Sequence, residues 1–196
     1  MTIRIEERFV VRAPAGSVWD YLVDPRRVVP CLPGAELAEV IDERTFHGSV
    51  KVKVGTVTVS YKGRVLLAEL DSTSRRVKMI GEGREATGTG SAKMTLESRV
   101  STLPDGTTDV TVRADLDVLG RIVQLGRGLI EQVAHQLFRQ FASCVRATLE
   151  AEAEAGLPAA AAVPQRAEPV RAIQLFFRAL WAWILSLFRR RRGTKA

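Results

Sequence analysis

Two histidines are the side chains best suited to acid–base or metal chemistry in this chain, and the sequence isolates both of them. His47 precedes a predicted strand and has no acidic or cysteine neighbour at a ligand spacing. His135 falls on the predicted polar face of a long helix. Because a protein metal site needs several ligands at defined spacings, these two residues predict no metal centre.

The two cysteines, Cys31 and Cys144, offer no other chemistry at the level of sequence. They form neither a metal-ligand spacing nor a disulfide framework. We interpret them as small buried thiols of a cytosolic protein. The N-terminal segment carries no apolar run of the signal-peptide type, which agrees with a cytosolic protein.

Pairs of carboxylates and a glycine-rich segment are the remaining candidates for catalysis. Glu6 with Glu7 and Asp115 with Asp117 fall on predicted solvent faces. The segment 81–91, GEGREATGTGS, lacks the Gly-Lys-Ser/Thr ending of a phosphate loop, and no helix follows it. We expect bent strands and a turn there. Without a nucleophile motif or a nucleotide fingerprint, the sequence predicts a protein that is not an enzyme.

A long helix from about Arg121 to Ala153 is the element on which the rest of the domain must be built. The stretch contains no proline, and its apolar residues recur with helical spacing, as in a helix that covers a core. Its predicted apolar face consists of Ile122, Leu129, Ile130, Val133, Leu137, Phe141 and Cys144. Gly126 lies within this face and leaves room either for close packing on a strand or for a ligand cavity.

The chain before this helix alternates with a period of two and predicts an antiparallel sheet. A first strand covers Ile3–Arg12, and two short helical pieces follow between Pro14 and Pro33. From Ala35 to Val118 apolar and polar residues alternate between turn signals, as in strands with one covered and one wet face. The predicted class is α+β, a curved antiparallel sheet of about seven strands around the long helix.

The positive charge of the chain is concentrated in its last residues. The net charge is +7, with 29 basic and 22 acidic residues, and segment 170–196 holds seven of the basic residues and no acid. The preceding 22 basic and 22 acidic residues cancel, which argues against a nucleic-acid-binding domain. We therefore predict three parts: a ligand-binding domain at 1–155, a flexible Ala/Pro linker at 156–169, and an Arg-rich tail at 170–196.

The tail has the pattern of an amphipathic helix that lies in a membrane interface. The apolar run 172–188 would span about 25 Å as a helix, short of the ~30 Å hydrocarbon core, and Arg178 interrupts it. We predict an in-plane anchor on the anionic cytoplasmic leaflet, with a partner-binding helix, a nucleic-acid tail and a spanning helix as alternatives. The predicted membrane-binding residues are Phe176, Phe177, Leu180, Trp181, Trp183, Ile184, Phe188, Arg189, Arg190, Arg191 and Arg192.

Two stretches carry a resemblance to a known family. The first runs PAGSVWDYLVDPRRVVPCLPGAE and contains Pro14, Val18, Trp19, Asp24, Pro25, Cys31, Pro33 and Gly34. The second is the long helix, with Gly120, Gly126, Leu129, Ile130, Ala134 and Phe141. Over roughly residues 1–150 the chain resembles the family of the G subunit of carbon monoxide dehydrogenase. That resemblance implies the helix-grip fold of the START superfamily.

The family resemblance also implies a function. It suggests an accessory protein that docks a molybdenum hydroxylase of the carbon monoxide dehydrogenase type at the cytoplasmic membrane. The superfamily implies a cavity for a lipophilic molecule, and we expect a non-covalent respiratory quinone such as menaquinone and no covalent cofactor. The expected lining residues are Trp19, Leu22, Val52, Val59, Met79, Met94, Val112, Gly126, Leu129, Val133 and Leu137. The alternatives are that these side chains fill the core of a docking adaptor that holds no ligand, or that the fold belongs to an enzyme.

Overall fold

The structure is a computed structural model that describes residues 1–156 of the chain. The order of elements begins with strand β1 (Thr2–Val11), helices α1 (Ala15–Val23) and α2 (Pro25–Val28) and a 3-10 turn, η1 (Val29–Cys31). Six further strands follow, and a second 3-10 turn and a long helix end the domain. These elements are β2 (Ala35–Val40), β3 (Thr45–Val54), β4 (Val57–Asp71), β5 (Arg76–Glu85), β6 (Ser91–Thr102), β7 (Thr108–Leu119), η2 (Arg121–Leu125) and α3 (Arg127–Glu154).

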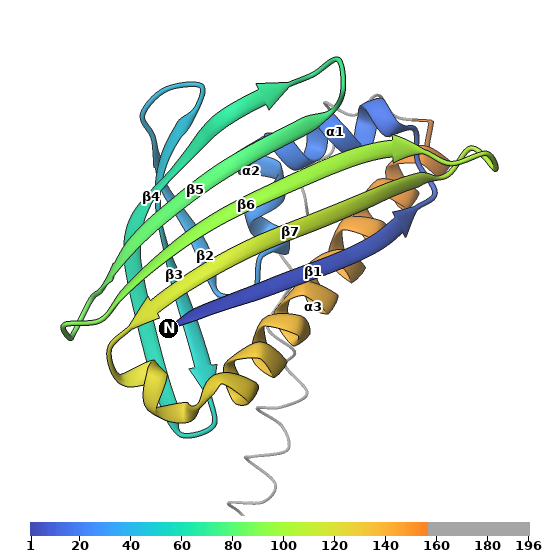
Figure 1. Ribbon diagram of the computed structural model, residues 1–196. Coiled ribbons are helices and arrows are strands. Elements are labelled where there is room, and N and C mark those ends of the chain that lie inside the picture. Colours follow the sequence, from blue (N-terminus) through green and yellow to red (C-terminus); the bar gives the residue numbers. More distant parts are fainter. Residues whose placement is uncertain (157–196) are drawn as a thin grey trace, which may run out of the picture. The chain divides into compact units, whose positions relative to one another are not determined.

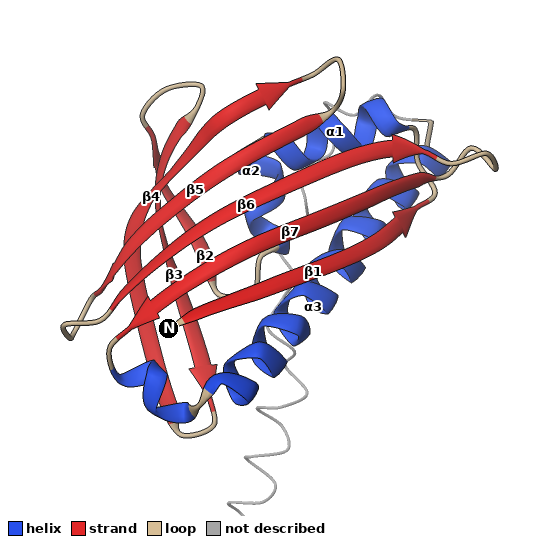
Figure 2. Cartoon of the chain, in the orientation of Figure 1, coloured by secondary structure: helices blue, strands red, loops and turns tan. Residues whose placement is uncertain are grey.

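The seven strands form one antiparallel sheet in the order β1-β7-β6-β5-β4-β3-β2. The first strand of the chain therefore pairs with the last, and the intervening strands follow each other as neighbours. Helix α3 packs along β1 and also reaches β3 and η1, so that the sheet curls around it (Figures 1 and 2). This arrangement confirms the predicted α+β fold with a curved sheet that grips a long helix.

A row of glycines crosses the sheet where it bends. Gly48 of β3 pairs with Gly63 of β4, which in turn pairs with Gly83 of β5. A Cβ atom placed on Gly63 would lie 1.9 Å from the carbonyl oxygen of Glu82, so a side chain cannot be accommodated there. The close approach of neighbouring backbones needs glycine at this position, and the row permits the strong curvature of β3–β5.

The long helix begins later than predicted, because Gly126 is not part of it. Its φ angle of +81° lies in the left-handed region, and its N–H bonds to the carbonyl of Val123 to close η2. Its carbonyl then accepts from the N–H of Ile130 in the first turn of α3. The prediction that Gly126 lies within the apolar face of a continuous helix is therefore wrong. A continuous helix would require an α-helical φ near −63° at this residue.

The two cysteines form a disulfide, which corrects the expectation of free thiols. Cys31 ends η1 and Cys144 lies on α3, 113 positions later in the sequence. The fold brings their Cα atoms to 5.4 Å, well within the range of a disulfide. The sequence argument failed because spacing along the chain carries no information on which segments α3 will meet.

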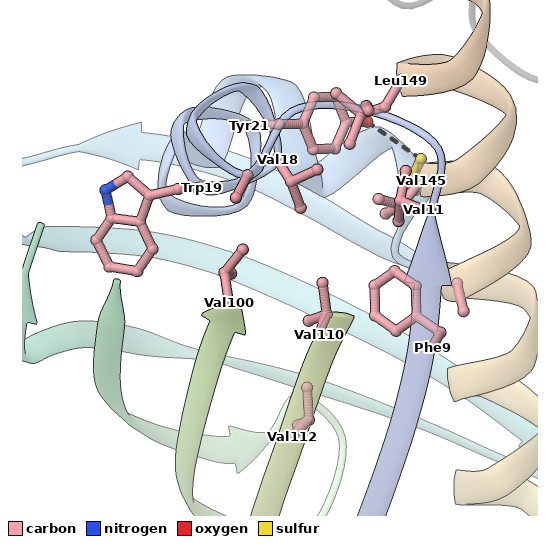
Figure 3. Packing of buried hydrophobic residues seen from close by; sticks show 14 of the residues in the cluster. Phe9, Val11, Val18, Trp19, Tyr21, Val100, Val110, Val112, Val145 and Leu149 are labelled. Atoms are coloured by element: carbon pink, nitrogen blue, oxygen red, sulfur yellow. Dashed lines mark hydrogen bonds between the residues drawn. The ribbon is translucent and has the colours of Figure 1, made fainter. Parts of the chain in front are cut away.

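The buried residues separate into two apolar clusters. The first cluster joins α1 and the C-terminal half of α3 to the sheet, and Figure 3 shows its packing. It includes Phe9, Val11, Val18, Trp19, Tyr21, Val100, Val110, Val112, Val145 and Leu149. The second cluster lies where η2 and the start of α3 meet the sheet, and its buried members are Ile3, Val59, Tyr61, Val118, Ile122 and Ile130.

Candidate ligand-binding site

Apolar residues that belong to neither core cluster mark the candidate site. Met94 of β6 and Val133 and Leu137 of α3 are half-buried, and none of them is part of the first or the second cluster. Met94 lies on the same face of β6 as Leu96, which packs against the first cluster, and Ala92, which packs against the second. Met94 therefore lies between the two clusters on this face of β6, and it is assigned to neither of them.

The structure distributes the predicted lining residues among these regions. Trp19, Leu22, Met79 and Val112 belong to the first cluster or pack against it. Val59 belongs to the second cluster, and Val52 packs against it. Core packing is thus the role of six of the eleven, while Met94, Val133 and Leu137 are half-buried and belong to neither cluster.

Gly126 and Leu129 do not line the region between the clusters. Leu129 is 40% exposed, and a Cβ placed on Gly126 would meet nothing within 4 Å. Both residues lie at the start of α3, which begins after Gly126. The sequence had predicted one continuous helix through this point. The shift in the helix start removes both from the centre of the inner face.

A buried carboxylate lies at the η2 end of the sheet. Glu85 ends β5, and its side chain is 1% exposed. It pairs with the guanidinium of Arg121 in η2, which is itself more than half exposed. A buried charge is costly unless it is paired, so Arg121 makes the burial of Glu85 possible.

Glycines surround the carboxylate of Glu85. A Cβ atom on Gly88 would lie 2.7 Å from its Oε2 atom, and one on Gly90 would lie 2.5 Å from the same atom. A Cβ atom on Gly120, which has a φ of +100°, would lie 2.6 Å from the Cα atom of Gly90. The glycine-rich segment 81–91 is therefore a bent strand end and turn, as predicted, and it encloses an acidic side chain that the sequence did not indicate.

Tyr61 lies beside Glu85 on the neighbouring strand. The two residues are direct partners in the β4–β5 register. Tyr61 is 7% exposed, and its hydroxyl is the one buried side-chain polar atom within residues 1–156 that has no hydrogen-bond partner. Burial, together with the negative charge of Glu85, raises the pKa of the Tyr61 phenol, so it stays protonated at neutral pH.

A second buried carboxylate fastens the opposite end of the domain. Glu152, near the end of α3, receives two hydrogen bonds from one Nη atom of Arg27 in α2, at 2.9 and 2.8 Å. Both side chains are almost fully buried, and the Arg27 guanidinium lies 4.8 Å from the ring centre of Tyr21. The hydroxyl of Tyr21 contacts Sγ of Cys31 at 3.2 Å. This end is thus fixed by polar contacts and by the disulfide.

His135 makes a contact that its predicted position did not suggest. Its Nδ1 atom lies 2.5 Å from Oε1 of Glu7 on β1. Glu7 was expected on the solvent face with Glu6, but it points toward α3 and its side chain is only 20% exposed. Glu6 does face solvent, where it pairs with Arg113. The contact between Glu7 and His135 joins the edge strand to the long helix.

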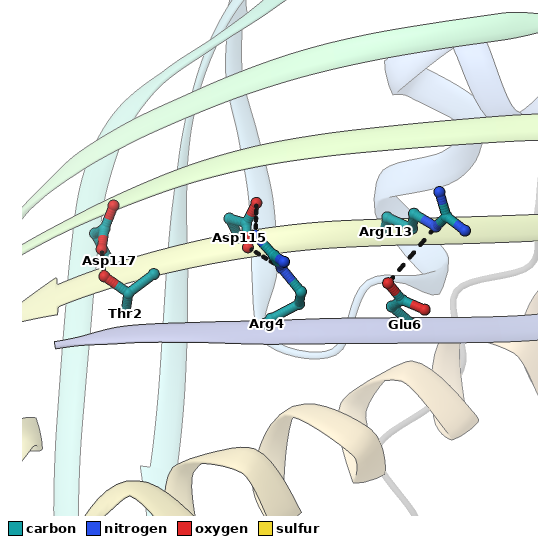
Figure 4. Close-up of polar contacts among 6 residues, drawn as sticks. All are labelled: Thr2, Arg4, Glu6, Arg113, Asp115 and Asp117. Atoms are coloured by element: carbon teal, nitrogen blue, oxygen red, sulfur yellow. Dashed lines mark hydrogen bonds and ion pairs between the residues drawn. The ribbon is translucent and has the colours of Figure 1, made fainter.

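Charged residues of alternating sign cover the outer face of β1 and β7 (Figure 4). Thr2 bonds to Asp117, Arg4 to Asp115 at 2.8 Å, and Arg113 lies 3.7 Å from Glu6. The hydrogen bond from Arg4 lowers the pKa of Asp115. These carboxylates are accounted for by cross-strand pairs, as expected for a wet sheet face.

Metal binding and membrane binding are the two remaining subjects of the sequence analysis. Within this range no group of His, Cys, Asp or Glu side chains could hold a metal ion. The helices of the same range, α3 included, lack the combination of length and apolar character that a membrane span requires. The eleven predicted membrane-binding residues, Phe176 to Arg192, all lie outside the described residues.

Sequence reasoning missed the buried polar residues, although a signal for one of them existed. Glu85 has the same strand parity as Val77 and Met79, so a strict period of two would have placed it on the inner face. Glu152 lies seven positions after Val145 and continues the same face of α3. Their partners, Arg121 and Arg27, are more than thirty positions away in sequence, and no local pattern could have identified them.

Comparison with known proteins agrees with this architecture. The profile of the family of the carbon monoxide dehydrogenase G subunit (CoxG) matches residues 8–150. No curated protein matches the chain.

Solved structures resemble the domain in fold. A conserved protein from Geobacillus kaustophilus is 18% identical, with a TM-score of 0.69 over 76% of this chain and 97% of its own. The Zhui aromatase/cyclase from Streptomyces sp. R1128 is 19% identical, with a TM-score of 0.61 over 81% of this chain and 100% of its own. A START superfamily protein from Mycobacterium smegmatis is 14% identical, with a TM-score of 0.53 over 76% and 97%. At these identities the likeness establishes the fold alone.

Proposed function

The chain belongs to the CoxG family of carbon monoxide dehydrogenase, and from this premise we propose that its domain carries a lipophilic molecule between sheet and helix. We propose a respiratory quinone such as menaquinone as that molecule. In this role the protein is an accessory of a carbon monoxide dehydrogenase-type molybdenum hydroxylase, as the family's name suggests. It acts at the cytoplasmic membrane and is not itself an enzyme.

One observation supports the carrier function above all. Met94, Val133 and Leu137 are half-buried apolar residues, and they belong to neither of the two core clusters. Burial of apolar surface stabilises a protein by roughly 25 cal/mol per Å², and surface that stays in contact with water does not contribute this free energy. A lipophilic guest beside these residues would complete the burial that the protein's own side chains leave unfinished.

The choice of a quinone follows from the partner that the family implies. A large soluble redox enzyme must pass its electrons to an acceptor that resides in lipid. A protein that holds the acceptor in an apolar site can bring it to the enzyme. The acceptor must then be lipophilic and redox-active, and a respiratory quinone has both properties.

The tail supports the membrane part of the proposal by its charge. Segment 170–196 contains seven basic residues and no acid, whereas the rest of the chain is neutral. Near an anionic leaflet each basic residue contributes about 1 kcal/mol, so the four arginines 189–192 supply roughly 4 kcal/mol. Replacement of these four by Gln should weaken binding strongly on anionic vesicles and little on neutral ones. Equal binding of the unaltered protein to both vesicle types would remove the electrostatic argument.

Organic extraction of the purified full-length protein, together with native mass spectrometry, tests the carrier function. We expect an isoprenoid quinone in stoichiometric amount. Val133→Trp should retain the fold and lose the quinone, because the indole would occupy the place that we propose for the guest.

Gln132→Trp is the matched control, since Gln132 is the exposed neighbour of Val133 on the same helix. It should keep both the fold and the quinone. If Val133→Trp instead melts early, as overpacked cores do, and the unaltered protein yields no lipophile, then the domain is a docking adaptor with a filled core.

A further inference from the structure

The hydroxyl of Tyr61 is a buried polar group on the inner face of the sheet for which the described residues supply no hydrogen-bond partner. The chain has two tyrosines, and both are buried. The hydroxyl of Tyr21 contacts Cys31, whereas that of Tyr61 has no partner within the described part of the chain. Buried polar groups are almost always hydrogen-bonded, and an unsatisfied one costs free energy. A bound molecule that supplies an acceptor would remove this cost.

The surroundings of Tyr61 define what kind of group could bind there. Tyr61 belongs to the second cluster together with Ile3, Val118 and Ile130, so its surroundings are largely apolar. Its register partner Glu85 already pairs with Arg121. The carboxylate nearby disfavours an anionic guest, and burial keeps the phenol protonated. The hydroxyl is therefore available as a neutral donor to a neutral acceptor.

We propose that Tyr61 donates a hydrogen bond to a carbonyl oxygen of the lipophilic guest and so fixes its head group at the η2 end of the inner face. This inference rests on the proposed carrier function and adds the residue that selects the guest. The apolar remainder of the guest would lie along Met94, Val133 and Leu137. Lipophiles without a carbonyl oxygen would still enter the site but would leave the Tyr61 hydroxyl unsatisfied.

A pair of probes that differ only in the acceptor tests this assignment. The first probe is a short-chain menaquinone, and the second is the matching prenylated methylnaphthalene, which lacks both ring oxygens. Each is titrated into full-length protein that has been stripped of lipid. A net hydrogen bond of ordinary strength predicts that the unaltered protein binds the quinone roughly two- to tenfold more tightly than the hydrocarbon.

Tyr61→Phe should abolish this preference and leave the affinity for the hydrocarbon unchanged or higher. Tyr21→Phe is the matched control, because it removes the other buried hydroxyl, which already has a partner, and it should keep the preference. The melting temperature of the empty protein should not fall in Tyr61→Phe, since no hydrogen bond of the protein is lost. A residue with a merely structural role would lower stability without changing the ratio of the two affinities.

The outcomes separate this inference from the proposed function. If Tyr61→Phe binds the quinone and the hydrocarbon with the same ratio as the unaltered protein, the role of Tyr61 is refuted and the carrier function stands. If the unaltered protein binds neither probe, the carrier function is refuted, and the inference fails with it. A preference that disappears in Tyr61→Phe and persists in Tyr21→Phe supports both.

Discussion

Reduction of the disulfide between Cys31 and Cys144 should lower the stability of the domain substantially. The bridge closes a loop of 113 positions that contains the whole sheet except β1. Chain entropy gives about 4.7 kcal/mol for a loop of about 100 residues, and native disulfides of small domains typically contribute about 2–5 kcal/mol. We therefore expect the free energy of unfolding to fall by about 2–5 kcal/mol. With a urea m-value of roughly 2 kcal/mol/M, the midpoint should fall by about 1–2.5 M.

Urea unfolding followed by circular dichroism, with and without reductant, measures this change. The variant that replaces both cysteines by Ala serves as the control, because reductant should leave its midpoint unchanged. The reductant arm isolates the covalent bond, since it retains both sulfur atoms, including the Cys31 sulfur that contacts the Tyr21 hydroxyl. If reductant leaves the midpoint of the unaltered protein in place, or if both thiols react with a thiol reagent before reduction, the reasoning is refuted.

Three further predictions concern the buried groups and the domain boundary. Arg27→Met should destabilise the domain by about 3–5 kcal/mol, because it leaves the buried carboxylate of Glu152 unpaired, and the double variant with Glu152→Leu should recover most of that loss in urea unfolding. Tyr21 and Tyr61 both have a pKa raised above 10.0 by burial. The stability that the two raised pKa values contribute is fully present below pH 10.0. It falls as the pH rises above 10.0, because the unfolded chain then releases the two phenol protons and the folded chain retains them. Ultraviolet titration of tyrosinate with and without urea checks this, and ionisation of both residues near pH 10 in the folded protein would contradict it. A chain truncated after Ala155 retains Glu152 and should give the same circular dichroism spectrum and melting temperature as the full-length protein, whereas an unfolded product would show that the boundary is wrong.

The fold could be read from the sequence because two hydrophobic periods alternate cleanly along the chain. The period of two from Ala35 to Val118 corresponds to six consecutive strands, and the helical period after Arg121 corresponds to η2 and α3. Each period depends on residues that are close together in sequence. The break at Gly126 escaped this reading because one glycine does not disturb the pattern on either side of it.

The candidate site could be predicted only in part, because its polar contacts join distant segments. Met94, Val133 and Leu137 were expected to line the cavity that the family resemblance implies, and all three are half-buried and belong to neither cluster. The pairing of Glu85 with Arg121 and the disulfide depend on where α3 and η2 come to rest against the sheet. Such contacts are properties of the tertiary arrangement, and propensity and spacing do not encode them.

The charged ladder between β1 and β7 has a consequence for the accuracy of folding. A shift of β1 by two residues would keep its apolar face toward α3, so burial alone hardly distinguishes the two registers. In one direction the shift would set Glu6 opposite Asp115, and in the other it would set Arg4 opposite Arg113. Like charges directly opposite each other repel, so both misaligned pairings are penalised. Strand β1 pairs with a strand that is synthesised about a hundred residues after it, and the charged pairs on the outer face favour the observed register over a shift of two residues.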